Sequence, residues 1–489
     1  MRTDPDVPNA ATAAPMRDLN AARPSHPRRW KALALLASAE FMVVLDASIV
    51  NIALPDIGNG LHLAATQLAW IITAYVVAFG ALLPLGGRLA DLLGRRLVFT
   101  AGIGLFSAAS LTAGLAPGGA ILIGARALQG IGAAMLAPAA LSLVTSTFPE
   151  GEERTKALSI WGAVAAGGAA AGVLFGGLLT GSLGWPSVFL INVPIGIAVI
   201  GMTRRVIPES RAERTGRLRV ADFDLPGAAT VTAGLVAIVI GLSQATSWGW
   251  TAPATIGLLA LGVVLLALFV RLQITGSHPL IPMRLLRLRT VAAGNAVMLL
   301  TGIAMLGLFY FLSLYEQIVL GYGPITAGLS QLPLAIALIL AAGVAAPLMT
   351  RFSDRAVLTA GLLGLAGGLV WFGLAPVTGS FPVDILGPSL LVGMGLGTAF
   401  VPITSIAVAG VPARDSGVAG GLVNTSQQIG GAVGLAALAT LANSRSHSVA
   451  STRTAISALN AGYSLAFLAA AAVAGIAALV AVSAAGRHR

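Results

Sequence analysis

The feature that most constrains this chain is a series of long apolar stretches separated by short charged or glycine- and proline-containing turns. The first, residues 32–55, is 24 residues long, and about 20 apolar residues in a helix span the roughly 30 Å hydrocarbon core of a bilayer. Fourteen such stretches follow one another along 489 residues, and 56% of the chain is hydrophobic. The sequence therefore predicts an all-α polytopic membrane protein with fourteen transmembrane helices.

Composition argues against several other classes of function. The chain has no cysteine, which excludes disulfides, iron–sulfur clusters and thiol nucleophiles. The five histidines are scattered over tails and loops, and neither Lys31 nor Lys156 follows a P-loop glycine pattern. The net charge of +11 is distributed over loops between apolar stretches, which does not indicate nucleic acid. We expect no metal, no cofactor and no enzymatic activity.

The basic residues predict the orientation of the helices. If the N-terminus is cytoplasmic, all but three of the 29 Lys and Arg residues fall on the cytoplasmic side. The exceptions are Arg445 and Arg453 outside and Arg126 within a helix. This bias predicts a multi-pass protein of the plasma (inner) membrane with both termini in the cytoplasm.

A long basic loop after the sixth stretch divides the chain into parts. Residues 1–30, rich in Ala, Pro and Arg, are predicted to be a disordered cytoplasmic tail. Residues 31–209 would form an N-terminal bundle of six helices, and residues 210–289 the basic loop with two linking helices. Residues 290–489 would form a C-terminal bundle of six helices with a short tail. This division is typical of transporters built from repeated halves, and we expect a monomer embedded in the lipid bilayer.

Two charged residues of opposite sign are predicted at the same depth in the membrane. Asp46 and Arg126 each lie nine residues from the outer end of their helix, which is roughly 13 Å at 1.5 Å per residue. An ionised Asp in hydrocarbon costs roughly 2.5 to 3.5 kcal/mol, so a partner is expected. The pair is either a proton-controlled switch or a permanent structural ion pair.

Two further acids lie within apolar stretches. Glu316 lies five residues before Gly321, about 7 Å from the outer end of its helix, among the aromatic residues Phe309, Tyr310, Phe311 and Tyr315. It either attracts a lipophilic cation and takes part in proton coupling or is solvated at the outer rim. Glu40, about 9 Å from Asp46 along the helix, is a second proton station or a partner for an arginine of a cytoplasmic loop.

Two motifs resemble those of the major facilitator superfamily. Residues 87–96 read GRLADLLGRR, between the second and third stretches, and residues 126–132 read RALQGIG in the fourth. Glycines permit a tight turn, and the acid can pair with arginines or face a helix N-terminus. The first motif predicts a cytoplasmic latch that breaks when the two bundles rock, or else ordinary loop charges. The latch residues are Gly87, Asp91, Gly94, Arg95 and Arg96.

A glycine pattern in the fifth stretch predicts close helix packing. Gly168, Gly172 and Gly176 are spaced four residues apart, with Gly177 next, which forms a small-residue face. The pattern resembles the antiporter motif of the superfamily, except that Val173 stands where a proline usually follows. Packing is therefore predicted without the proline kink, and the pattern alone does not determine the direction of transport.

Three more segments resemble the fourteen-helix drug:proton antiporter branch of the superfamily. They are LDASIVNIALP at 45–55, FLINVPIG at 189–196 and the glycine-rich 417–434 with NTSQQ at 424–428. The resemblance covers about residues 30–484. It implies a major facilitator fold with two extra linking helices, and export of drugs or antibiotics in exchange for protons.

Polar side chains within the apolar stretches are candidates for a substrate cavity, and hydrogen bonding between helices explains them equally well. The cavity candidates are Asn51, Gln129, Asn295, Tyr310, Gln317, Asn424 and Gln428. Together these features predict a proton-coupled secondary transporter that exports amphipathic, cationic drugs or antibiotics by alternating access. Two alternatives remain: a proton-coupled carrier dedicated to one metabolite, as exporter or importer, and a non-transporting membrane receptor.

Overall fold

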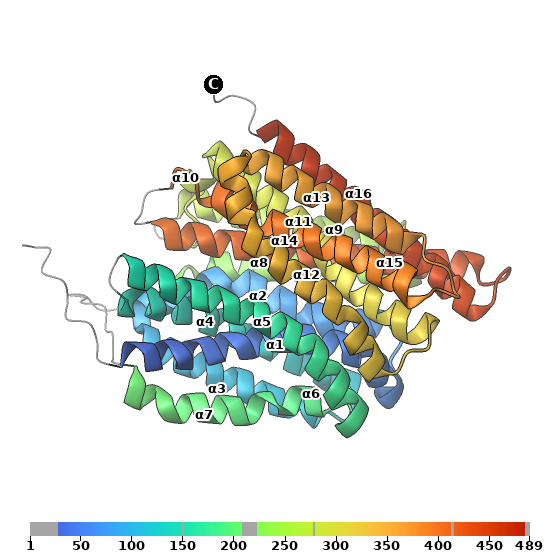
Figure 1. Ribbon diagram of the computed structural model, residues 1–489, viewed down its shortest axis with the longest axis horizontal. Helices are drawn as coiled ribbons and strands as arrows, with labels where there is room; N and C mark the ends of the chain where they lie inside the picture. Colours follow the sequence, from blue (N-terminus) through green and yellow to red (C-terminus); the bar gives the residue numbers. More distant parts are fainter. Residues whose placement is uncertain (1–27, 149–150, 208–222, 277–278, 412–414, 485–489) are drawn as a thin grey trace, which may run out of the picture.

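The structure, a computed structural model, is a bundle of helices that lie side by side and alternate in direction (Figure 1). It describes residues 28–148, 151–207, 223–276, 279–411 and 415–484. Residues 1–27 of the predicted tail and residues 208–222 of the basic loop lie outside the described residues. We call the end of the bundle at which α1 (Arg29–Leu61) begins the terminal end, and the opposite end the distal end.

The first half of the chain forms six spans joined by short connections. They are α1, α2 (Ala65–Leu93), α3 (Arg95–Gly114), α4 (Gly119–Thr147), α5 (Glu152–Leu183), and a sixth span made of α6 (Ser187–Leu190) and α7 (Asn192–Val206). Gly94 alone links α2 to α3, with φ of 106°, a left-handed conformation that glycine adopts without a steric penalty. Connections this short force neighbouring helices to run antiparallel.

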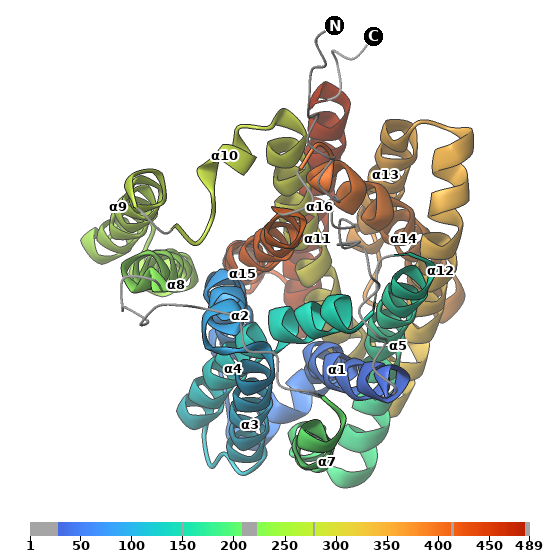
Figure 2. The same ribbon diagram turned by 90° about the vertical axis from the view of Figure 1, so that its left-hand side faces the viewer.

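Two linking helices follow, and the second half then repeats the pattern of six spans. The linking helices are α8 (Leu225–Trp248) and α9 (Pro253–Thr275), followed by the short α10 (Met283–Leu286). The second half contains α11 (Arg289–Leu314) with its π-helical extension η2 (Tyr315–Val319), α12 (Pro324–Arg351), α13 (Asp354–Gly373), η3 (Phe381–Leu386) leading into α14 (Gly387–Val408), α15 (Ser416–Val449) and α16 (Ala455–Ala484). Figure 2 shows α8 and α9 beside the bundle, where α8 contacts both α2 and α15 at the seam between the halves.

Thirteen helices in the described part of the chain are long and apolar enough to cross a membrane. The fourteenth member of the set is α15, which is 34 residues long, rich in glycine and polar residues, and packed against α2, α11 and α16. The predicted all-α fold of two six-helix bundles plus two linking helices is confirmed. Large apolar side chains such as Val264, Leu340 and Leu479 are more than 60% exposed, as expected for a surface that faces lipid.

The two halves contact each other at the distal end and separate toward the terminal end. A Cβ atom on Gly177 of α5 would lie 2.5 Å from the carbonyl oxygen of Pro324 at the start of α12, so the two helices touch there. In contrast, Leu158, Ile160 and Gly162 in the terminal part of α5 are exposed around the helix. Between α5 and α12 the two halves are therefore in contact at the distal end and open at the terminal end.

Candidate functional site

Asp46 lies fully buried in α1 and accepts hydrogen bonds from three side chains. Its Oδ2 accepts from Arg126 Nη1 of α4 at 2.5 Å. Its Oδ1 accepts from Gln129 Nε2 at 3.0 Å and from Asn192 Nδ2 at 2.8 Å. Both carboxylate oxygens thus accept hydrogen bonds from side-chain donors, one of them charged.

The Arg126 guanidinium is held on several sides. Its Nε donates to the Ile71 carbonyl of α2 at 3.0 Å, and its Nη1 also donates to Gln129 Oε1 at 2.9 Å. The group lies over the Tyr75 ring, 4.3 Å from the centroid, which adds a cation–π attraction. Arg126 is only 1% exposed, so its charge depends on these partners in place of water.

The sequence brings this network together through helix geometry. Gln129 lies three residues after Arg126 on α4, so both side chains are on the same face. Asn192 is the first residue of α7. Gln129 was a candidate for the substrate cavity, but the structure places it in this buried network, where it also donates to Ser110 Oγ at 2.7 Å. Tyr75 and Ser110 were not singled out from the sequence, because neither lies in a recognisable motif.

Glu316 is also fully buried, with neutral partners. Its two carboxylate oxygens accept from Ser330 Oγ and Gln331 Nε2 of α12, each at 2.7 Å. Of the two alternatives for Glu316, the acid solvated at the outer rim is therefore wrong. The residue lies in the π-helical turn η2, which changes the angular register that an α-helix would have at this point.

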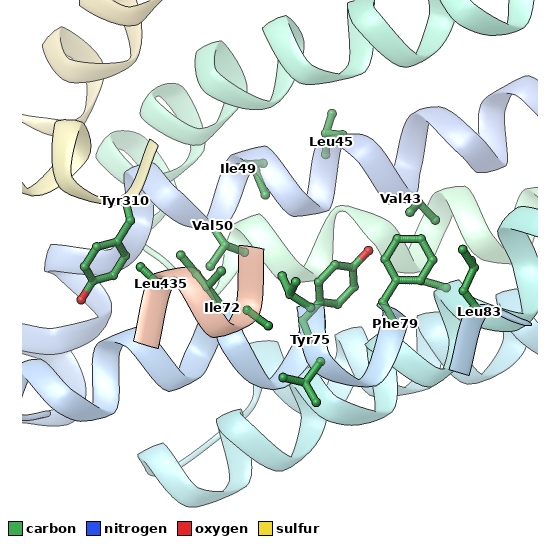
Figure 3. Close-up of a cluster of buried hydrophobic side chains, with 14 of the residues drawn as sticks. Val43, Leu45, Ile49, Val50, Ile72, Tyr75, Phe79, Leu83, Tyr310 and Leu435 are labelled. Carbon is green, nitrogen blue, oxygen red and sulfur yellow. The ribbon is translucent and has the colours of Figure 1, made fainter. Parts of the chain in front are cut away.

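The end of α11 and the π-helical segment η2 that follows it connect the two halves of the bundle. Ser313 Oγ donates to the Asn51 carbonyl at 2.6 Å, and Gln317 Nε2 donates to the Ile52 carbonyl at 2.9 Å. Figure 3 shows Tyr310 of α11 at one edge of a buried apolar cluster that includes Ile49 and Val50 of α1 and Leu435 of α15. We call the contacts of Ser313 and Gln317 with α1 the distal gate.

A cavity of about 630 Å³ lies at the distal end between the two halves. Of the predicted cavity residues, Tyr310 and Gln317 line it, whereas Asn51, Asn295, Asn424 and Gln428 do not. Its lining also includes Asp56 of α1, which sequence reasoning missed because it follows Pro55 at the end of the apolar run, where an acid would be solvated. We call this cavity the distal pocket.

The other cavity candidates contact neighbouring helices or their own. Asn295 of α11 accepts a hydrogen bond from Ser426 of α15 at 2.9 Å, which ties two helices of the second half. Asn51 donates to the Ala47 carbonyl of its own helix at 3.1 Å. A Cβ atom on Gly80 of α2 would lie 2.6 Å from the Cβ atom of Gln428. Gln428 of α15 therefore packs against α2 across the seam between the halves.

Glu40 and the predicted latch lie nearer the terminal end. Glu40 is half-buried, and its Oε2 atom has no hydrogen-bond partner among the described residues. At the start of α3, Arg95 donates to the Ser142 carbonyl at 3.4 Å and Arg96 to the Ile207 carbonyl at 3.2 Å. These arginine contacts join α3 to α4 and to the end of α7, within one half. Asp91 is exposed beside them.

The glycines of α5 lie against two different helices. Cβ atoms on Gly172 and Gly176 would lie 2.9 Å from the carbonyl oxygens of Leu45 and Ile49 in α1, and Gly168 faces α1 in the same way. Gly177 instead faces α12 of the other half. The glycine face therefore sets the position of the helix that carries Asp46 and also forms part of the contact between halves.

The comparison with family models decides the classification. The model of the Major Facilitator Superfamily matches residues 36–435. The chain belongs to that superfamily. This superfamily member is 42% identical to the cephamycin export protein of Amycolatopsis lactamdurans over 415 residues, which cover 84% of this chain and 85% of that one. It is 40% identical to the puromycin resistance protein of Streptomyces alboniger, over 90% of this chain and 86% of that one.

Solved structures support the fold of this superfamily member. A bacterial homologue of the human lysosomal transporter Spinster, in an inward-facing and unoccupied conformation, matches with a TM-score of 0.66 and 17% identity over 94% of this chain and 97% of that one. An auto-inhibited peptide transporter of the POT family matches with a TM-score of 0.67 and 18% identity, over 94% and 97% of the two chains. At these identities the likeness concerns the fold alone.

Proposed function

We propose that the protein is a secondary transporter that exports amphipathic, cationic drugs or antibiotics across the plasma membrane in exchange for protons. The observation that carries the proposal is the buried Asp46–Arg126 pair, joined by a 2.5 Å hydrogen bond in the first half of a major facilitator fold. The names of the relatives, an exporter of cephamycin and a determinant of puromycin resistance, support drug export.

The orientation follows from the basic residues. Arg29, Arg96 and Arg284 lie at the terminal end, which we therefore assign to the cytoplasm, with both termini there. The distal end then faces outside. With the halves in contact at the distal end, the described conformation is closed to the outside, and an exported compound would enter from the cytoplasm.

Proton binding to Asp46 would alter the pairing inside the first half. When the carboxylate is neutralised, its attraction to Arg126 falls, whereas the bonds of Arg126 to Gln129 and the Ile71 carbonyl persist. The change in buried charge biases the equilibrium between outward-open and inward-open states. Glu316, next to the distal gate, is a second candidate for proton coupling, and Glu40 a third.

Two glycine-containing regions would accommodate this motion. In the proposal, the cytoplasmic latch is the turn from α2 to α3. Gly87 and Asp91 lie near the end of α2, Gly94 forms the turn, and Arg95 and Arg96 begin α3. At the other end of the bundle, Gly177 allows α5 and α12 to approach closely while the outside is closed. Rocking of one half against the other would break the contact of Gly177 with α12.

The test uses inverted membrane vesicles that contain the protein and are energised to an acidic interior. A lipophilic cation or antibiotic that the protein exports should enter these vesicles, and the interior should become more alkaline as protons leave. Asp46→Asn, present in the membrane in equal amount, should abolish the alkalinisation that depends on the compound. An unchanged response in this variant would remove Asp46 from the coupling mechanism.

A carrier dedicated to one metabolite is the second candidate. It is favoured by the name of one relative, which specifies cephamycin alone. A panel of structurally unrelated cations and antibiotics in the same vesicles distinguishes the two candidates. Alkalinisation by several compounds supports the multidrug exporter, and a response to one class only supports the dedicated carrier. Alkalinisation that requires the compound to be preloaded inside the vesicles, with the compound leaving together with the protons, would indicate an importer.

A further inference from the structure

The distal pocket is large enough for a drug-sized molecule and has walls from both halves. Its volume of about 630 Å³ lies within the roughly 300 to 1,000 Å³ of small-molecule sites. Pro55, Asp56 and Leu68 line it from the first half, and Asn443 and Tyr463 from the second. The pocket is separate from the Asp46 network, which shares no residue with its lining.

The lining has one formal charge. Asp56 is its only acid, and it contains no lysine, arginine or histidine. Asp56 is half-buried on α1, where the pocket shields it in part from water. A cation that enters the pocket would therefore meet an unopposed carboxylate within the lining, whereas an anion would be repelled.

The other part of the lining is aromatic and already ordered. Tyr310 and Phe311 make an edge-to-face contact with ring centroids 5.0 Å apart, and Phe311 lies 5.7 Å from the Tyr463 ring. Tyr322 completes this group. Aromatic rings attract cations by roughly 0.5 to 2 kcal/mol per contact and offer flat apolar surface to a lipophilic body. Two of the four aromatic residues predicted to surround Glu316, Tyr310 and Phe311, thus line a pocket whose carboxylate is Asp56.

One lining residue also belongs to the distal gate. Gln317 lines the pocket, and its Nε2 donates to the Ile52 carbonyl of the opposite half. A molecule in the pocket would contact both halves while the gate is closed. Because the bound molecule contacts both halves only when the gate is closed, its binding would shift the equilibrium between the open and closed distal end toward the closed state.

We infer that the distal pocket is a second binding site, reached from outside, for lipophilic organic cations with an aromatic body. Its occupation holds the distal gate closed and slows export. Asp56 is the counter-ion in this site, and the aromatic group binds the apolar body. The effect on export, and the outside location of the pocket, rest on the proposed function, whereas the binding of a cation does not.

The natural absence of cysteine allows a direct test. Asn59 lines the pocket one turn after Asp56 and is exposed, so Asn59→Cys places a single thiol at the pocket. Intact cells are treated from outside with a membrane-impermeant cationic or anionic thiosulfonate, with and without tetraphenylphosphonium. The matched control is Thr251→Cys, exposed at the distal end between α8 and α9 and outside the lining.

The expected result has three parts. Tetraphenylphosphonium slows labelling of Asn59→Cys at least fivefold and leaves Thr251→Cys unchanged. Relative to the control site, the cationic reagent reacts about tenfold faster than the anionic one. Adding Asp56→Asn removes this preference and raises the tetraphenylphosphonium concentration needed for protection at least fivefold. The control Asp384→Asn removes another distal acid outside the lining. It changes neither the preference for the cationic reagent nor the concentration needed for protection.

Other outcomes overturn the inference. Equal protection at both positions, no protection, or protection that is unaffected by Asp56→Asn would show that the pocket does not bind the cation through this carboxylate. A thiol at Asn59 that reacts only in inverted vesicles would place the pocket inside the cell. Labelling Asn59→Cys with a bulky cationic reagent should also reduce the initial rate of export at least threefold, and an unchanged rate would refute the link to the gate.

The proposed function and the pocket can fail separately. Protection at Asn59→Cys without any compound-driven alkalinisation in inverted vesicles would leave the binding site in place and reject export. Alkalinisation with no protection at Asn59→Cys would retain export and reject the second site.

Discussion

The two fully buried acids of the described chain that accept side-chain hydrogen bonds, Asp46 and Glu316, differ in what surrounds them. Asp46 pairs with the guanidinium of Arg126, whereas the partners of Glu316 are the hydroxyl of Ser330 and the amide of Gln331. Equal burial therefore has different consequences. Asp46 is one member of an ion pair in which each charge depends on the other, whereas Glu316 accepts hydrogen bonds from two uncharged groups.

The largest effect is expected from Asp46→Asn. The change leaves the Arg126 charge buried without its counter-ion, and breaking a buried pair in this way costs about 3 to 5 kcal/mol. The new amide group also faces donors, since Gln129 and Asn192 both donate to this position. We expect a fall of this size in the free energy of unfolding, measured by denaturant titration in detergent micelles.

A double variant separates the loss of stability from the loss of coupling. Asp46→Asn combined with Arg126→Gln removes both charges and should recover at least half of the lost stability. Compound-driven alkalinisation should stay absent, because no group remains at this site that can exchange a proton. Recovery of alkalinisation in the double variant would mean that the pair is structural and that protons are coupled elsewhere.

A smaller effect is expected from Asn192→Leu. The side chain keeps similar volume but no longer donates to Asp46 Oδ1, so one charge-assisted hydrogen bond, worth about 1.5 to 3 kcal/mol, is lost. The free energy of unfolding in detergent micelles should therefore fall by less than it does in Asp46→Asn, because the Asp46–Arg126 pair remains. A loss as large as that of Asp46→Asn would show that Asn192 contributes as much as the ion pair.

The difference between the two acids was only partly predictable from the sequence. The common depth of Asp46 and Arg126 follows from counting nine residues along two helices, because the rise per residue is constant. The partners of Glu316 do not follow from such counting. They depend on how η2 turns relative to α12, and a π-helical turn breaks the regular register.

The same limit applies to the cavity candidates. Side-chain type identified Gln129 and Gln317 as polar groups in apolar helices, but type does not say which helix each one faces. Gln129 joins the Asp46 network, and Gln317 lines the distal pocket. Asp56 was not predicted, because its functional setting comes from residues of α15 and α16 that are almost 400 residues away in the chain.

Ser330→Ala should have a modest effect that sharpens the comparison. It removes the donor to Glu316 Oε1, while Gln331 continues to donate to the other oxygen. A single hydrogen bond of this kind contributes about 1 kcal/mol net, so the unfolding free energy should fall by about that amount. A loss comparable with that of Asp46→Asn would contradict the description of Glu316 as an acid with modest, neutral partners.

The smallest effect is expected from Glu316→Gln, the counterpart of Asp46→Asn. The new amide nitrogen would face Gln331 Nε2, but the Oε1 atom of Gln331 has no hydrogen-bond partner among the described residues. A flip of the Gln331 amide therefore presents an acceptor to the new donor, and Ser330 can still donate to the remaining oxygen. The unfolding free energy should change by less than about 0.5 kcal/mol, because no charge is left unpaired.

With stability preserved, the alkalinisation assay reports the role of Glu316 in proton coupling without the structural effect that complicates Asp46→Asn. A large loss of stability in Glu316→Gln would instead mean that the ionised form of Glu316 holds the distal gate together.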